Sequence, residues 1–188
     1  MKLDYECTEC RLHETRIQVV WGSGNLNSKL CFMGEGPGRE EDEQGEAFVG
    51  QAGDMLIRIL KLLKITRQDI LILNLVKCRP PNNRNPRSDE IAACRTYLNT
   101  QIMEAKNLNT IVALGRVPWK GLTGRSESVT ALHGSTVKIG RYLYLYTYHP
   151  SYLLRNQTVE LKYQFLRDIR KALYLSGMRN IKSTWRPS

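Results

Sequence analysis

The stretch LCFMGEGPG, residues 30–38, joins a short apolar run to a glycine-rich loop, and this join decides the fold. The run Leu30–Gly34 is almost continuously apolar, which is typical of a strand that is buried on both faces. Further short apolar runs that we interpret as strands lie at Ile70–Val76, Ile111–Gly115 and Tyr142–Tyr148. The sequence therefore predicts a central sheet of about four strands.

Longer segments with helical periodicity alternate with these runs. In Ala52–Ile65 the charged residues recur at helical spacing, and apolar residues fill the opposite face. Asp89–Asn107 and Thr158–Ser176 are predicted helices of the same kind. Strands that alternate with helices favour an α/β fold with a mostly parallel sheet. The proline-rich segment Pro80–Pro86 is neither helix nor central strand, so we predict a loop there.

Length and charge limit the class of protein. The chain has 188 residues and is 41% hydrophobic, which fits one domain, 1–188, with residues 178–188 as a candidate flexible or partner-binding tail. Twenty-eight Lys and Arg residues against 18 Asp and Glu give a formal charge of +10. Such a charge attracts polyanions, nucleic acid above all, although an acidic membrane surface would respond to it too. The chain has neither a bilayer-spanning apolar stretch nor a signal-peptide core, so we expect a cytoplasmic protein.

Four of the five cysteines have a spacing that suggests metal ligation. Cys7 and Cys10 form a CxxC pair, whereas Cys78 and Cys94 are separated by fifteen residues. An ordinary zinc ribbon uses two tight pairs, while an iron–sulfur cluster accepts four thiolates from distant loops. Four unrelated thiols in a reducing compartment are the alternative. Cys31, inside an apolar run, is interpreted as a small buried hydrophobic residue.

Three segments come at the predicted carboxyl ends of strands, where ligands bind in open parallel sheets. They are the glycine loop 34–38, Asn74, and the segment that begins at His149. The glycine loop is not a dinucleotide fingerprint, because Pro37 removes an N–H and an acidic run follows. We interpret it as a loop that approaches a neutral planar group, although a tight turn before a solvated acidic face is the alternative.

The side chains at these positions each have a structural and a functional interpretation. Phe48, on a glycine-flanked loop, is either a core residue or a platform on which a base stacks. Asn74 is either a satisfied buried amide or a reader of a ligand edge with one donor and one acceptor. The segment Leu153-Leu154-Arg155 after His149 resembles a wedge that opens a duplex, unless its leucines pack inward as a helical turn.

Together these segments resemble the family-4 uracil-DNA glycosylases, the iron–sulfur class of the uracil glycosylase superfamily. The motifs are GEGPG with its acidic run, AFVGQAG, NLVKCRPPNNRNP with a downstream cysteine, and YHPSYLLR, in the order of the family. The likeness runs from about Cys7 to Arg155. It implies a three-layer α/β/α sandwich and a [4Fe–4S] cluster on Cys7, Cys10, Cys78 and Cys94.

The resemblance also implies the activity and its partners. The substrate would be uracil-containing DNA, single- or double-stranded, and the products free uracil and an abasic site. We expect a monomeric DNA-repair enzyme of the prokaryotic or archaeal cytosol that does not associate with membranes. DNA contacts are expected from Arg79, Arg84, Arg87, Leu153, Leu154 and Arg155.

Site roles follow by resemblance, residue by residue. His149 would donate to the charge that develops on uracil O2, and Asn74 would read the N3–H and O4 edge. Gly36 and Pro37 would form the pocket wall, Glu35 would lie near the uracil ring and help exclude a C5 methyl, and Phe48 would stack on the base. In the best-known branch an Asp that activates water occupies the position of Gly36. Unless the water needs little activation, we expect Glu41 or Glu35 to orient it, and we expect Glu41 or another residue of the acidic run to hold the Asn74 amide in one orientation.

Two other functions remain open from the sequence. One is a glycosylase of the same superfamily with broader base specificity. The other is a non-catalytic iron–sulfur or zinc protein that binds nucleic acid, which the charge and the cysteines fit equally well. The second gives no purpose to Glu35, Asn74 and His149 at strand ends.

Overall fold

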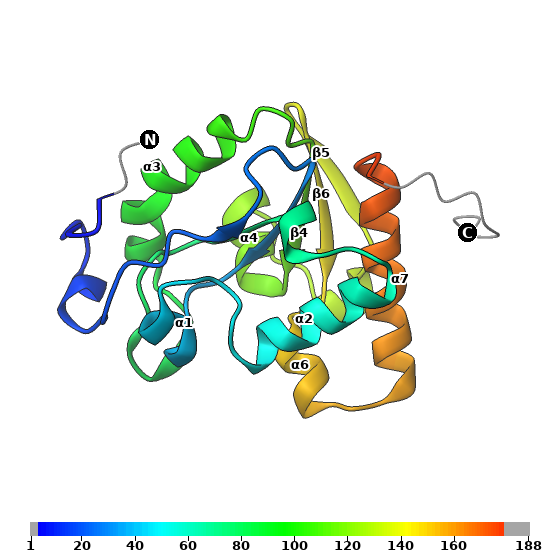
Figure 1. The fold of residues 1–188 in the computed structure, drawn as a ribbon, viewed down its shortest axis with the longest axis horizontal. Helices are drawn as coiled ribbons and strands as arrows, with labels where there is room; N and C mark the ends of the chain where they lie inside the picture. Colours follow the sequence, from blue (N-terminus) through cyan, green and yellow to red (C-terminus); the bar gives the residue numbers. More distant parts are fainter. Residues whose placement is uncertain (1–3, 179–188) are drawn as a thin grey trace.

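The computed structural model describes residues 4–178 and contains one six-stranded sheet (Figure 1). The spatial order is β1-β3-β2-β4-β6-β5, and the four central strands β3, β2, β4 and β6 are parallel. The two edge strands run antiparallel to their neighbours. In chain order the strands are β1 Ser23–Gly24, β2 Leu30–Gly34, β3 Leu71–Asn74, β4 Thr110–Leu114, β5 Thr136–Ile139 and β6 Tyr142–Thr147.

Alternation along the central strands sends side chains into two separate cores. Phe32 of β2 belongs to one buried cluster and Met33 to the other. The paired strands follow the same rule, because Ile72 is opposite Phe32 and Leu73 is opposite Met33. Since each strand must bury both faces, its sequence is apolar at nearly every position.

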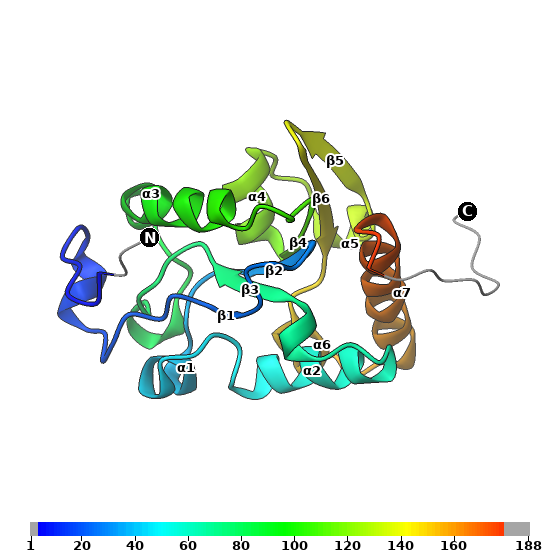
Figure 2. The ribbon, with the colours of Figure 1, turned by 45° about the horizontal axis from the view of Figure 1, so that its top comes forward.

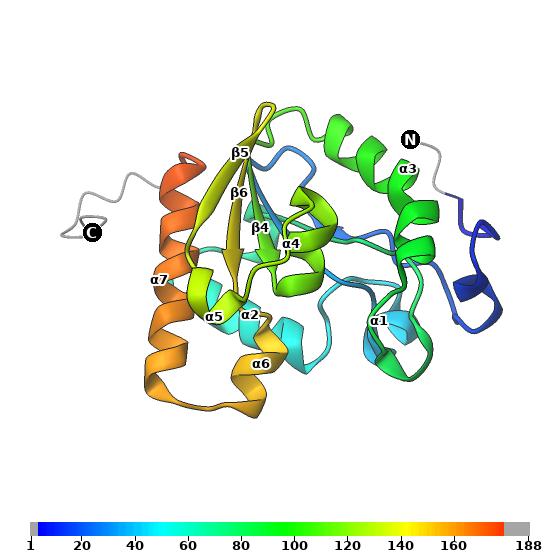
Figure 3. The ribbon, with the colours of Figure 1, turned by 180° about the vertical axis from the view of Figure 1, so that it is seen from behind.

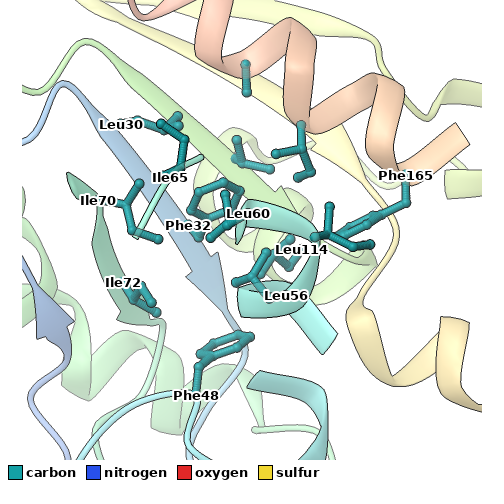
Figure 4. Close-up of a cluster of buried hydrophobic side chains, with 14 of the residues drawn as sticks. Leu30, Phe32, Phe48, Leu56, Leu60, Ile65, Ile70, Ile72, Leu114 and Phe165 are labelled. Atoms are coloured by element: carbon teal, nitrogen blue, oxygen red, sulfur yellow. The ribbon is translucent and has the colours of Figure 1, made fainter. Parts of the chain in front are cut away.

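Helices cover both faces of the sheet, as the predicted three-layer α/β/α sandwich requires (Figures 2 and 3). The first core lies under α2 (Gln51–Leu62), α6 (Pro150–Arg155) and α7 (Val159–Leu175), and part of it is drawn in Figure 4. The second core lies under α3 (Ser88–Glu104) and α4 (Arg116–Thr123). The shorter helices are α1 Arg39–Gln44 and α5 Val129–Leu132, with 3-10 turns at Arg11–Glu14, Arg67–Asp69 and Pro81–Asn83.

The predicted fold class is confirmed, and the number of strands differs. The four predicted strands are the four central ones, and the predicted helices match α2, α3 and α7. The edge strands were not predicted, since β1 has two residues and β5 is largely exposed, so neither has an apolar pattern. The candidate tail lies outside the described residues after Met178. Between residues 4 and 178, we find no helix with the length and apolarity needed to cross a bilayer.

Candidate active site

The carboxyl ends of β2, β3 and β6 meet at one cavity of about 430 Å³. All six residues that we expected at a base-binding pocket line this cavity, which lies where ligands bind in open parallel sheets, beyond the carboxyl ends of the strands. The lining residues are Glu35, Gly36, Pro37, Gly38, Glu41, Phe48, Ala52, Asn74, Pro80, Asn83, Arg84, Asn85, Pro86, His149, Ser151 and Arg155.

Asn74 is the last residue of β3 and is 2% exposed. Its Oδ1 atom accepts no hydrogen bond from the described residues. A buried acceptor without a partner costs about 1–3 kcal/mol, so this oxygen is a binding position for a ligand N–H. Gly34 lies opposite Asn74 in the neighbouring strand, and a Cβ there would collide with Oδ1 and with the Phe48 ring. Only glycine lets the amide and the ring approach so closely.

Phe48 forms an apolar wall at the end of the first core. Its ring lies beyond the tip of β2 (Figure 4) and is 6.1 Å from the His149 ring, measured between centroids. The backbone of Phe48 has φ +57°, an uncommon conformation for a residue with a side chain. Arg67 donates hydrogen bonds to the carbonyl oxygens of Ala47 and Phe48 and so fixes this turn. Sequence reading missed Arg67, because it precedes β3 and carries no motif.

His149 is the residue before α6, and its ring is fixed in one tautomer. The backbone N–H of Ser151 donates to Nδ1 over 3.2 Å, and the Ser151 hydroxyl oxygen is 2.8 Å from the same nitrogen. Because an amide N–H can only donate, Nδ1 is unprotonated, and the proton of the neutral ring is on Nε2. Burial, together with the positive charge of Arg155, lowers the pKa of His149 to about 4. The site therefore contains a neutral imidazole donor near neutral pH.

Glu35 follows β2 directly and is partly buried at the same cavity. Burial raises its pKa, while the positive charges of Arg116 and Arg155 oppose that rise. A Cβ at Gly115 would lie 3.2 Å from the Cβ of His149 and 3.8 Å from Oε1 of Glu35. The β4–α4 turn thus brings Glu35 near the imidazole.

The contacts of Glu41 differ from the contact with the Asn74 amide that we expected. Its Oε2 accepts from the Gly38 N–H at 3.1 Å, and its Oε1 accepts from Val49 and Gly50 at 3.0 and 2.8 Å. The carboxylate therefore joins the glycine loop to the loop that carries Phe48. No hydrogen bond between Glu41 and Asn74 is present in the described part of the chain, contrary to our expectation.

The residues expected at DNA differ in their availability. Arg87 is exposed, and Arg79 donates to Asn83 Oδ1. Arg84 makes a two-point ion pair of 2.6 and 2.8 Å with Glu90, whose side chain is fully buried. This pair lowers the pKa of Glu90 and raises that of Arg84. The guanidinium of Arg84 is thus already paired with a carboxylate of the protein itself.

The wedge prediction is wrong for Leu153. Leu153 is fully buried in the first core, because Pro150–Arg155 forms a helical turn that packs against α2. Leu154 is half-buried, whereas Tyr152 and Arg155 are exposed. Tyr152, which we had not assigned, is stacked on Tyr148 with a centroid distance of 5.6 Å.

Cys7, Cys10, Cys78 and Cys94 line a second cavity, of about 10 Å³. Burial raises the pKa of Cys78 to about 12 and also raises those of Cys10 and Cys94. Thiols of this kind stay protonated until a metal displaces the proton. Cys31 is fully buried in the second core, as expected.

Two cations lie beside Cys7, Cys10, Cys78 and Cys94. We call these four cysteines the cysteine group. Arg16 donates to the Cys7 carbonyl at 2.7 Å and lies 3.6 Å from the Cys78 sulfur, and Lys77 lines the same cavity. Four soft donors with adjacent positive charge suit a thiolate-bound cluster. Within residues 4–178, no set of three or more His, Cys, Asp or Glu side chains is arranged around a position for a single metal ion.

Comparison with known proteins identifies the family of the chain. The family model of the uracil DNA glycosylase superfamily matches residues 21–173. A type-4 uracil-DNA glycosylase of Thermotoga maritima is 47% identical over 169 residues, which are 89% of this chain and 88% of that protein. Proteins of the same name from Saccharolobus solfataricus and Archaeoglobus fulgidus are 39% and 35% identical, over 89% and 92% of this chain and 82% and 89% of theirs. The chain therefore belongs to the uracil-DNA glycosylase superfamily.

Proposed function

We propose that the protein is a uracil-DNA glycosylase of DNA repair that hydrolyses the N-glycosidic bond of uracil and leaves an abasic site. The observation that carries the proposal is the buried, unpaired Oδ1 of Asn74 in a cavity that also contains Phe48 and a neutral His149. Uracil N3–H is a donor of the kind that this oxygen lacks. The names of the relatives support the same activity.

Recognition requires the nucleotide to leave the base stack, because the bond cannot be reached within a duplex. In the pocket, Asn74 accepts from N3–H and donates its amide N–H to O4, while Phe48 stacks on the ring. Cytosine has an acceptor at position 3 and an amino donor at position 4. With the amide held in one orientation, cytosine therefore leaves two buried groups unpaired.

Bond cleavage separates an oxocarbenium-like sugar from a uracil anion. The Nε2–H of His149 donates to uracil O2, where negative charge develops. A preorganised donor of this kind contributes about 2.7–4 kcal/mol to a transition state. Since the ring is neutral, it stabilises the anion as a hydrogen-bond donor rather than as a cation.

Water attacks the sugar from the side opposite the base. Both oxygens of Glu41 already accept backbone N–H groups. That leaves Glu35 as the carboxylate that orients the water. Gly36 and Pro37 contribute the wall of the pocket, and an oxocarbenium ion needs little activation of its nucleophile.

We further propose that Cys7, Cys10, Cys78 and Cys94 hold a [4Fe–4S] cluster, which when bound cross-links the N-terminal segment to the chain after β3. The formal charge of +10 supports binding to the phosphate backbone through Arg79, Arg87 and Arg155. The protein would act as a monomer of one domain in a prokaryotic cytosol, with DNA as its partner and uracil as its released product.

The test is cleavage of a labelled oligonucleotide that contains one uracil, followed by alkali, which breaks abasic sites. We expect a single alkali-dependent break at the uracil position and release of free uracil. Matched strands with cytosine, thymine or hypoxanthine measure base specificity, and His149→Ala, purified in the same way, excludes a contaminant. A uracil strand that stays intact would refute the proposal.

A further inference from the structure

Lys77 is a fully buried lysine between the candidate pocket and the cysteine group. Its side chain is 1% exposed, and it lies between Asn74, the last residue of β3, and Cys78. Its Nζ atom donates a 2.8 Å hydrogen bond to the backbone carbonyl of Asn74. Fully buried lysines are rare, because an ammonium loses its hydration there.

The side chain of Lys77 lies beside thiols. It lines the cavity of the cysteine group, and burial lowers its pKa to about 8, while Cys94, Cys31 and Cys78 oppose that fall. The main chain of Lys77 is also engaged, since its carbonyl accepts from Val20 N–H at 2.7 Å. One residue thus contacts the cysteine group, the N-terminal segment and the last residue of β3.

The side-chain amide of Asn74 depends on its main chain for position. Its Oδ1 has no partner among the described residues, and Glu41 does not reach it. The peptide that follows Asn74 is held at two points, since the Leu75 N–H donates to the Gly34 carbonyl at 3.1 Å and the Asn74 carbonyl faces Lys77. The Lys77 ammonium holds that carbonyl.

We infer that Lys77 is a positioning residue through which the cysteine group fixes the base-reading amide of Asn74. The inference rests on the proposed function. Lys77 does not touch the base but acts through the Asn74 carbonyl. Thiolates that bind a cluster balance the ammonium, and the ammonium keeps Asn74 oriented toward the pocket.

The test is Lys77→Met, which retains the volume and apolar stem but removes the donor. Iron content and the melting temperature of the purified variant are measured alongside the Kd for free uracil and the single-turnover excision rate. If the charge-assisted hydrogen bond from Lys77 supports uracil binding, its loss should weaken the affinity for uracil about tenfold. The control Lys171→Met loses an equivalent hydrogen bond, from Nζ to the Gly134 carbonyl at 2.8 Å, and lines neither the pocket nor the cysteine group, so its uracil Kd should match wild type.

The outcomes separate the two proposals. If wild-type protein binds uracil and Lys77→Met binds it equally well, the positioning role is refuted. If wild-type protein neither binds nor excises uracil, the proposed function itself fails. Equal loss of uracil affinity in Lys171→Met and Lys77→Met would also refute the role, since the loss would then follow from removal of any lysine-to-carbonyl hydrogen bond.

A measurement on the wild-type protein covers the case in which Lys77→Met does not fold. Hydrogen exchange of peptides that span residues 74–78 and the start of α3 is followed with and without saturating uracil. Because Lys77 joins these segments, uracil should slow exchange in both. Protection confined to pocket loops, with no change at residues 74–78, would overturn the inference.

Discussion

The strand-end pocket and the cysteine group are held together in opposite ways. In the pocket, each functional side chain is fixed by the protein itself: Ser151 sets the His149 tautomer and Arg67 fixes the turn at Phe48. In the cysteine group, four thiols line a small cavity, and burial raises the pKa values of Cys10, Cys78 and Cys94. The pocket is thus preorganised by protein contacts, whereas we propose that a metal cluster would hold the segments of the cysteine group.

Because of this difference, we expect substitutions in the pocket to affect mainly the excision rate and substitutions in the cysteine group to affect mainly the stability of the protein. Changes in the pocket should alter the excision rate and leave the fold intact, because side chains that face the ligand contribute little to core packing. Changes in the cysteine group should mainly alter the fold, and they should reach the pocket through Lys77 as weaker uracil binding.

Cys78→Ser should have the largest effect, on stability. The loss of a structural metal belongs to the few changes that cost more than about 4 kcal/mol. Denaturant unfolding, iron content and visible absorption measure it. Cys31→Ala is the matched control, because Cys31 is buried in the second core outside the cysteine group and should keep its iron. A Cys78→Ser protein as stable and as coloured as wild type would contradict the proposed cluster.

His149→Ala should reduce the single-turnover excision rate about 10²–10³-fold, the usual loss for one preorganised donor. Its melting temperature should stay close to that of the wild type. In Ser151→Ala the backbone N–H that sets the tautomer remains, so its rate should fall much less. If His149→Ala retained the wild-type rate, the imidazole would have no role in the chemistry.

Asn74→Ala should weaken uracil binding by about 1–3 kcal/mol, the value of a buried hydrogen-bonded amide. Affinity for undamaged DNA should not change, because Asn74 is 2% exposed and is reached only by a base that enters the cavity. Asn74→Asp is the sharper variant, since a carboxylate still accepts from N3–H but cannot donate to O4. A variant that excised uracil at full rate would remove Asn74 from base recognition.

The sequence predicted the pocket well because strand ends in a parallel sheet converge whatever the loops do. Leu30–Gly34 and Asn74 are where the apolar runs place them. Local turn geometry was not predictable: Phe48 has a positive φ, and the N–H groups of Val49 and Gly50, which follow it, donate to Glu41. Lys77 was missed because a lysine in a sequence is taken as a surface residue. The inward packing of Leu153 was one of two open alternatives, and only tertiary contacts decided it.

The pH dependence of excision tests whether the imidazole acts as a neutral donor. The pKa of His149 is lowered to about 4, so the rate should stay level from pH 8 down to about 5 and fall toward pH 4. Arg155→Gln removes one of the causes and should move this fall to higher pH. The same shift in the pKa of His149 also affects folding. Between about pH 4 and 6.5 His149 is protonated in the unfolded state but not in the folded state, so the free energy of unfolding rises with pH in that window. A loss of rate centred near pH 6.5 would contradict a neutral, buried ring.

The smallest effects on excision should come from Arg84 and Arg87, which lie between Cys78 and Cys94 in the sequence. Arg87→Ala removes an exposed charge, so DNA affinity should become less salt-dependent, with the slope of log K against log[salt] reduced by about 1. Arg84→Ala leaves the buried Glu90 carboxylate without its partner, so its main effect should be a lower denaturant midpoint. Fluorescence anisotropy across a salt series, paired with urea unfolding, distinguishes the two. If Arg84→Ala changed the salt slope as much as Arg87→Ala and left stability unchanged, Arg84 would be a phosphate contact after all, and the ion pair with Glu90 would yield to DNA.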